Sequence, residues 1–164
     1  MARIDPNQQI LPSVFDRLLD EFPDEGRDRQ KSRGQPLAEL RNAIRRDLEA
    51  LLNTRQRHLS WPPGLEELNR SLINFGIPDV TRINVATQQD RVNFCHELEM
   101  AIRRHEPRFQ KLKVVMLDNA EPMDRTLRFR VEALVYADPT PEAMIFDSSL
   151  DPVTQNFSVN KSNG

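Results

Sequence analysis

Residues 87–116, TQQDRVNFCHELEMAIRRHEPRFQKLKVVM, decide the fold, because their hydrophobic period changes from that of a helix to that of a strand. The apolar residues of the first part recur every three or four positions and trace one helical stripe: Val92, Cys95, Leu98, Ala101 and Ile102. Thr87 and Asp90 have the spacing of a reciprocal cap at a helix start. This part of the stretch therefore predicts a long amphipathic helix.

Pro107 marks the change of period. A proline disfavours helical geometry in the residue before it, so the helix should end near His105. The backbone should then leave Glu106 in an extended direction, and strand signals follow at once.

Two strands are predicted after this corner. Apolar and polar residues alternate over 112–116 and again over 127–135, as in half-buried strands. Residues 118–126 are typical of a turn, so the strands should pair as an antiparallel hairpin with its apolar side on the helices. One or two further short strands are indicated by four residues: Ile145, Phe146, Phe157 and Val159.

A second long helix is predicted upstream, starting near Pro36, whose missing amide costs nothing in a first helical turn. Its apolar stripe comprises Leu37, Leu40, Ile44, Leu48, Leu51 and Leu52. The other face is charged and should meet water or a partner, and Arg45 and Glu49 are spaced to pair across one turn. Shorter helices are expected over 14–22 and over 65–75, the latter closed by Gly76 in a left-handed conformation.

Helices first and strands last predict an α+β fold, with N-terminal and central amphipathic helices packed on a small C-terminal mixed or antiparallel sheet. The 164 residues suit one domain, which we expect to span 12–159. Residues 1–11 and 160–164 should be flexible termini, and the polar segment 23–35 a loop.

Composition excludes several classes of function. The net charge of -2 gives no positive field toward nucleic acid, and the basic cluster between 27 and 33 is better explained as a solvated loop. Cys95 is the only cysteine and should be buried packing in a reducing compartment. No signal peptide or membrane-spanning run is predicted, so we expect a cytoplasmic protein that does not insert into the membrane.

No catalytic, metal or cofactor site is predicted. His96 and His105 fall on opposite faces of one helix and cannot share a metal. The glutamates at 66, 67, 97 and 99 stand among charged neighbours, whereas a glycosidase acid needs a desolvated carboxyl. A distant pair brought together by folding is left open.

Glu106, Pro107 and Arg108 are the candidate functional unit. In extended backbone, residues two apart point the same way, so the acid and the guanidinium should face one side. A proline between them reduces the entropy lost on binding, which suits a protein-docking clamp. Alternatively, Pro107 only ends the helix while its neighbours pair with each other in water.

Four motifs occur in order, each at an element boundary: Phe15-Asp16-Arg17-Leu18, Leu51-Leu52-Asn53-Thr54-Arg55, Phe75-Gly76-Ile77-Pro78-Asp79 and Glu106-Pro107-Arg108. Together they resemble the TssE family of type VI secretion baseplate subunits, relatives of the lysozyme-like wedge proteins of contractile phage tails. The Glu-Pro-Arg triplet is the hallmark of that family. Asn53 and Arg55 match another of its motifs, either as partner contacts or simply as a helix end.

The resemblance implies a structural subunit, not an enzyme. It implies wedge partners TssF, TssG and TssK and sheath proteins TssB and TssC, in a baseplate docked at the inner membrane. The triplet would hold the bundle of wedge helices, and the C-terminal sheet would pair with a sheath strand to help initiate sheath assembly. Two alternatives stay open: a peptidoglycan glycosidase, as the lysozyme-like label suggests, and an unrelated cytoplasmic adaptor.

Overall fold

The computed structural model describes residues 34–57, 61–62, 64–78, 87–119, 124, 126–137, 140–151 and 153–161. The helix expected over 14–22 and the basic cluster between 27 and 33 lie outside these residues.

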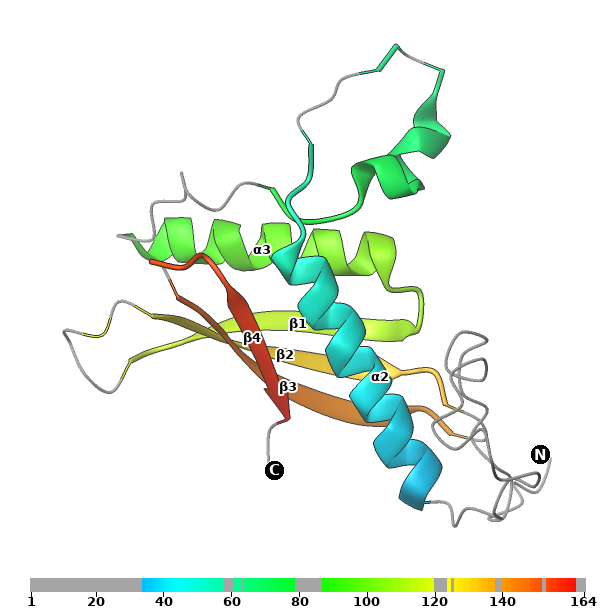
Figure 1. Ribbon diagram of the computed structural model, residues 1–164. Coiled ribbons are helices and arrows are strands. Elements are labelled where there is room, and N and C mark those ends of the chain that lie inside the picture. The colour runs from blue at the N-terminus through cyan, green and yellow to red at the C-terminus, as the bar shows by residue number, and fades with distance from the viewer. Residues whose placement is uncertain are drawn as a thin grey trace.

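Two long helices and a four-stranded sheet make up most of the described part of the chain (Figure 1). The elements follow in the order α2 (Gly34–Asn53), the 3-10 turns η1 (Glu66–Arg70) and η2 (Leu72–Asn74), α3 (Gln88–His105), β1 (Phe109–Leu117), β2 (Leu127–Val135), β3 (Glu142–Leu150) and β4 (Phe157–Lys161). Helices precede strands, which confirms the predicted α+β class.

The sheet has the strand order β1-β2-β3-β4, and every pairing is antiparallel. The predicted hairpin is confirmed, with Val114 of β1 opposite Val131 of β2. The two additional strands suggested by the sequence are β3 and β4, in which Leu150 lies opposite Phe157. Each strand therefore pairs with its neighbour in sequence.

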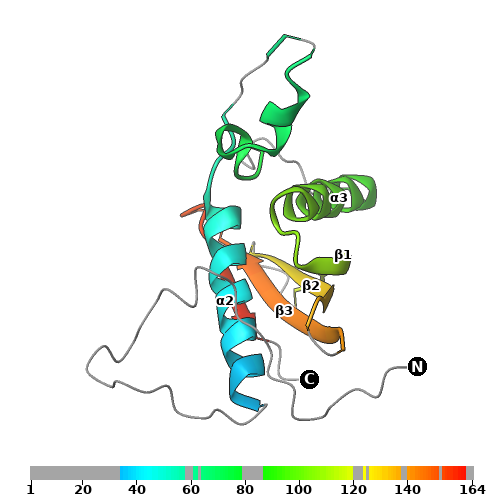
Figure 2. The same cartoon turned by 90° about the vertical axis from the view of Figure 1, so that its right-hand side faces the viewer.

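Both helices cover the same face of the sheet (Figures 1 and 2). α3 runs along β1, and α2 crosses β4. The core between these layers contains alternate strand residues, with Phe129 at its centre. The Phe129 ring meets Phe94 of α3 and Phe157 of β4 edge to face, at centroid distances of 6.4 and 5.9 Å. Each fully buried Phe stabilises the fold by roughly 1.5–3 kcal/mol.

α2 confirms the predicted stripe. Its buried residues include Leu40, Ile44, Leu48, Leu51 and Leu52. Arg45 pairs with Glu49 at 2.9 Å across one turn, as expected. The helix begins at Gly34, two residues before Pro36. None of the helices in the described ranges is both long and apolar enough to cross a membrane.

α3 starts with the predicted reciprocal cap. The Thr87 hydroxyl accepts from the Asp90 amide, and the Asp90 carboxylate accepts from the Thr87 amide. The predicted stripe is correct except at Val92, which is 53% exposed, whereas Phe94 is buried. Residues two positions apart in an α-helix are rotated by about 200° from each other. Burying Phe94 therefore turns Val92 toward solvent.

The α-helix predicted over 65–75 is wrong. The segment forms η1 and η2, interrupted by Ser71, whose backbone is extended and whose hydroxyl donates to the Leu68 carbonyl. Leu72 is 88% exposed and Leu65 is 49% exposed. A periodic stripe stabilises an α-helix only when a core covers it, and here the segment stands away from the sheet (Figure 1).

Candidate functional site

The Glu106–Arg108 corner joins α3 to β1. Glu106 is the residue after the last turn of α3, and its amide donates to the Ile102 carbonyl at 2.8 Å. Its backbone has left the helical region (φ -121°, ψ 84°), as a residue before proline must. The Arg108 carbonyl accepts from the Tyr136 amide at 2.8 Å, so the corner is fixed to the end of β2 as well.

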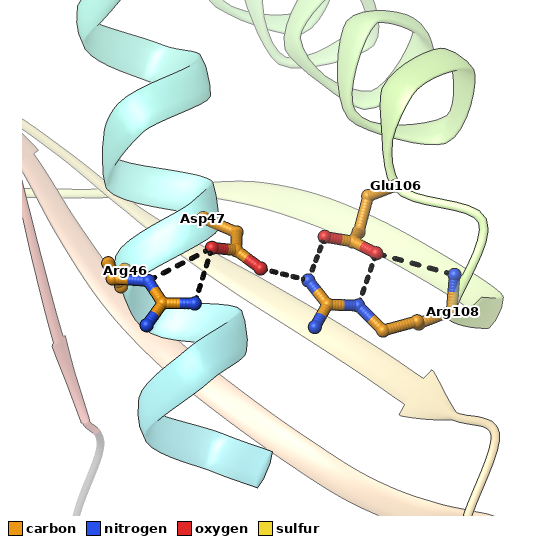
Figure 3. A network of polar contacts seen from close by, with 4 residues as sticks. All are labelled: Arg46, Asp47, Glu106 and Arg108. Carbon is orange, nitrogen blue, oxygen red and sulfur yellow. Dashed lines mark hydrogen bonds and ion pairs between the residues drawn. The ribbon is translucent and has the colours of Figure 1, made fainter. Parts of the chain in front are cut away.

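The Glu106 carboxylate and the Arg108 guanidinium face one side, as predicted, and they form an ion pair with each other (Figure 3). Nε and Nη2 of Arg108 donate to the two carboxylate oxygens of Glu106 at 2.6 and 2.5 Å. Nη2 also donates to Asp47 of α2 at 2.6 Å, and Arg46 donates to the other oxygen of Asp47 at 3.2 Å. The corner is therefore a four-residue network that spans two elements.

Burial by itself would lower the pKa of Arg108, but the hydrogen bonds and charges of Glu106 and Asp47 raise it above its usual value. The guanidinium is thus permanently charged and fixed in orientation. Glu106 is buried, while 22% of the Arg108 side chain remains exposed. Removing one partner of such a pair costs up to about 3–5 kcal/mol when the other charge stays buried.

Nη1 of Arg108 is the remaining amino group of the fork. Within the described residues it donates to no acceptor, and Figure 3 shows it directed away from both carboxylates. A guanidinium held on two sides keeps its third side available for a carboxylate or carbonyl oxygen.

Asn53 is the last residue of α2 and Arg55 follows it, and both hold the turn into β4. The Asn53 amide group donates to the Phe157 carbonyl at 2.9 Å, and its oxygen accepts from the Phe157 amide at 2.8 Å. Arg55 donates to the Gln155 carbonyl at 2.8 Å, and its guanidinium lies 5.9 Å from the Phe157 ring centroid. Both side chains thus bind within the chain, at a place separate from the corner.

The second and third motifs meet in a short parallel bridge between Arg55 and Ile77. The Ile77 amide donates to the Thr54 carbonyl at 2.9 Å, and its carbonyl accepts from Gln56 at 2.8 Å. Gly76 has a φ of +118°, which confirms the predicted left-handed conformation, but it closes no α-helix. A Cβ at this position would lie 2.5 Å from the Thr54 carbonyl oxygen. Close backbone approach is therefore the second reason for glycine here.

Asn74 connects this bridge to the corner. Its side chain is buried and bonds to Gln56 and to the Asn69 carbonyl, and its own carbonyl contacts Nε2 of His105 at 3.0 Å. Burial lowers the pKa of His105, partly offset by this hydrogen bond. Because His105 adjoins Glu106, η1 and η2 are tied to the same end of α3 as the Glu-Pro-Arg triplet.

Sequence reasoning missed Asp47, the residue that links the triplet to α2. Asp47 belongs to the charged face expected to meet water or a partner, and nothing in its local pattern separates it from Arg46 or Glu49. Only the packing of α2 beside the corner selects it. Phe15 to Leu18 of the first motif and Asp79 of the third lie outside the described residues.

Among the described carboxylates, Glu106 is the buried one, and both its oxygens accept hydrogen bonds from Arg108. Glu97 is exposed, and Glu99 pairs with Arg103 at 2.9 Å. Cys95 is buried as expected, and burial raises the pKa of its thiol. Within the described ranges, no three His, Cys, Asp or Glu side chains gather as a metal site.

Comparison with known proteins gives two matches. The family model described as "Baseplate wedge protein gp25" matches residues 38–140, well over half of the chain. A chain of a solved structure described as "The baseplate complex from the type VI secretion system" is similar with a TM-score of 0.47 and 14% sequence identity, covering 70% of this chain and 96% of that chain. No curated protein matches. The region matched by the family model contains Asp47 and the whole Glu106–Arg108 corner.

Proposed function

Because the chain belongs to the family of the baseplate wedge protein gp25, we propose that it is a TssE-like structural subunit of a type VI secretion baseplate. It works by docking onto neighbouring subunits and catalyses no reaction. Family membership supports the structural role in a baseplate, and the ordered motifs support the narrower assignment.

The Glu106–Arg108 corner is the docking site in this proposal, and the observation that carries it is the free third side of the Arg108 guanidinium. Two carboxylates hold the guanidinium in one orientation, so little conformational entropy is lost when a partner oxygen binds Nη1. Pro107 is exposed beside it and adds a rigid apolar surface. Glu106 acts by positioning Arg108, and the partner is contacted by Pro107 and Arg108.

The partners in this proposal are the wedge proteins TssF, TssG and TssK at the corner and the sheath proteins TssB and TssC at the sheet. Among the described residues, β4 pairs only with Phe146 to Leu150 of β3. No described residue pairs with 142–145 of β3 on that side, and a strand added by a partner would bind there. Asn53 and Arg55 contribute by holding β4 in place. The subunit acts in the cytoplasm, in a baseplate docked at the inner membrane.

Co-purification with wedge subunits tests the corner. Arg108→Lys keeps the positive charge but loses the planar set of N–H donors of the guanidinium. Glu106→Gln keeps the side-chain shape but loses the negative charge that orients the Arg108 guanidinium. Both should reduce recovery of wedge subunits at least about tenfold, the change for roughly 1.4 kcal/mol. Glu97→Gln, on the exposed face of α3, is the matched control and should leave the recovery of wedge subunits unchanged.

Each variant is first checked by urea unfolding and amide exchange, so that only folded protein enters the capture. Unchanged recovery of wedge subunits with folded Arg108→Lys and Glu106→Gln would contradict the proposal that the corner is the docking site. Loss of recovery in the Glu97→Gln control would show that the assay reports general damage to α3.

A further inference from the structure

The η1 and η2 turns carry large apolar side chains that remain in solvent. Leu72 is 88% exposed, Ile73 is 51% exposed and Leu65 is 49% exposed. Single exposed apolar residues are ordinary on a protein surface, but Leu72 and Ile73 are neighbours on one short turn. Neither belongs to the core, because this part of the chain stands away from the sheet (Figure 1).

The backbone of η2 holds Leu72 in this exposed position. The Phe75 amide donates to the Leu72 carbonyl at 3.2 Å, and the Asn74 amide donates to the Ser71 carbonyl at 3.1 Å. The buried side chain of Asn74 also donates to the Asn69 carbonyl at 2.9 Å, which joins η2 to η1. A surface fixed by its own hydrogen bonds loses little conformational entropy when a partner covers it. The exposed apolar surface of η2 is therefore preorganised for binding.

Two contacts with His105 hold η2 at the end of α3 where the Glu106–Arg108 corner begins. The Asn74 carbonyl contacts Nε2 of His105 at 3.0 Å. The Phe75 ring meets the His105 ring edge to face, at a centroid distance of 5.2 Å. In Figure 1, η1 and η2 lie next to the end of α3 from which the chain continues into β1. Because Leu72 and the corner are attached to the same helix end, their separation is fixed.

The two surfaces select different groups on a partner. Nη1 of Arg108 binds an oxygen acceptor, either a carboxylate or a carbonyl, whereas the η2 turn binds an apolar pocket. Protein interfaces commonly combine an apolar centre with polar contacts around it. Once one contact has formed, the second becomes intramolecular if the partner has both groups at the matching separation, and its effective concentration then reaches the millimolar range.

We propose that Leu72 and Ile73 bind an apolar pocket on the same wedge subunit that provides the oxygen acceptor for Arg108. This inference rests on the docking function proposed for the corner and adds a second contact to it. The Arg108 contact fixes the orientation of the partner, because its hydrogen bonds are directional. Burial of the two aliphatic side chains adds affinity, because removing apolar surface from water is favourable in any orientation.

Co-purification of the whole chain with wedge subunits tests the contact. Leu72→Asp should reduce recovery of wedge subunits at least about tenfold, because a charge then faces an apolar pocket. Leu72→Met keeps the apolar volume and should retain recovery. Val153→Asp, at a position 87% exposed between β3 and β4, is the matched control and should leave recovery unchanged. Each variant should unfold at the same urea concentration as the unchanged chain, because the replaced side chains lie in solvent.

Photo-crosslinking identifies the partner. A benzoylphenylalanine in place of Leu72 should crosslink to the subunit whose recovery falls with Arg108→Lys, and a crosslink to a different subunit would overturn the proposal. Full recovery with Leu72→Asp, alongside loss with Arg108→Lys, would also overturn it and leave the corner as the docking site. The reverse result would contradict the docking role of the corner, and with it a partner shared by both surfaces.

Discussion

At the scale of single residues, the same side chains serve the fold and the proposed docking site. Glu106 is buried but makes two hydrogen bonds to Arg108, so its burial is compensated. Asp47 adds a second carboxylate to the same guanidinium. The triplet was predicted to bind another chain, but its Arg108 is already bound to Glu106 and Asp47 of the same chain. The outer side of Arg108 remains for a partner.

Gly76 provides the sharpest test at this scale. Gly76→Ala must place a Cβ at a φ of +118° and 2.5 Å from the Thr54 carbonyl oxygen, so the bridge between Arg55 and Ile77 has to move. We expect a loss of more than about 1 kcal/mol in the free energy of unfolding, measured by urea titration. Gly64→Ala shares the positive φ but meets nothing within 4 Å, so it should cost less. Equal losses for both would show that close approach is unimportant.

At the scale of elements, α2 and β4 are joined by polar contacts as well as by the core. Asn53 binds both backbone groups of Phe157, in the manner of a neighbouring strand. β4 pairs with β3 over five residues only, so this side-chain contact fixes the start of a short edge strand. An edge held in this way presents a defined surface for strand addition.

Asn53→Asp and Asn53→Ala should separate the two hydrogen bonds. Aspartate keeps the acceptor for the Phe157 amide and loses the donor, whereas alanine loses both. We expect alanine to cost about 1–2 kcal/mol and to accelerate amide exchange over Phe157–Lys161, because each lost hydrogen bond costs about 1 kcal/mol. Asn160→Ala, exposed on the same strand, is the control. Unchanged β4 exchange in Asn53→Ala would contradict the assignment.

The turn from β1 into β2 should respond to acid. Hydrogen bonds from Thr126 and Arg128 lower the pKa of Asp124 to about 2. A carboxyl with a lowered pKa in the folded state stabilises the fold above its ordinary pKa of 3.8, and that contribution is lost as the pH falls through about 2. Asp124→Asn should therefore flatten the dependence of unfolding free energy on pH between 4 and 2. An unchanged slope would contradict this prediction.

At the scale of the whole molecule, α2 and α3 cover one face of the sheet. The Asp47–Arg108 ion pair ties α2 to the corner between α3 and β1 at a separation of 61 residues in sequence. This ion pair, 2.6 Å long, connects α2 to the C-terminal half of the chain. The corner and α2 should therefore resist separation as one unit.

A double-mutant cycle over Asp47→Ala and Arg108→Ala measures this link. Asp47 is 37% exposed, and solvent screening reduces the interaction, so we expect a coupling energy of about 0.5–1 kcal/mol in urea unfolding. The coupling should decrease in high salt. A cycle over Arg91 and Asp118, whose carboxylate is 94% exposed, should give a smaller value. Additive losses at Asp47 and Arg108 would show that the two elements are held by the core alone.

Much of this protein was determined by the sequence alone. Apolar period and capping residues placed α2, α3 and the β1–β2 hairpin, and Pro107 placed the corner between helix and strand, because these signals act over a few neighbouring residues. The motifs likewise indicated the baseplate family. The triplet was predicted as two charges on one side, and the pairing of Glu106 with Arg108 was the alternative interpretation.

Tertiary structure decided the rest. It assigned Asp47 to Arg108 and Asn53 to Phe157, which are far apart in sequence, and it turned residues 65–75 into two 3-10 turns because no core covers their stripe. It also showed a second reason why position 76 requires glycine, which is the close approach of the Thr54 carbonyl. Local periodicity says which face of an element seeks burial, but only the packing of distant elements says what that face, or a charged one, will meet.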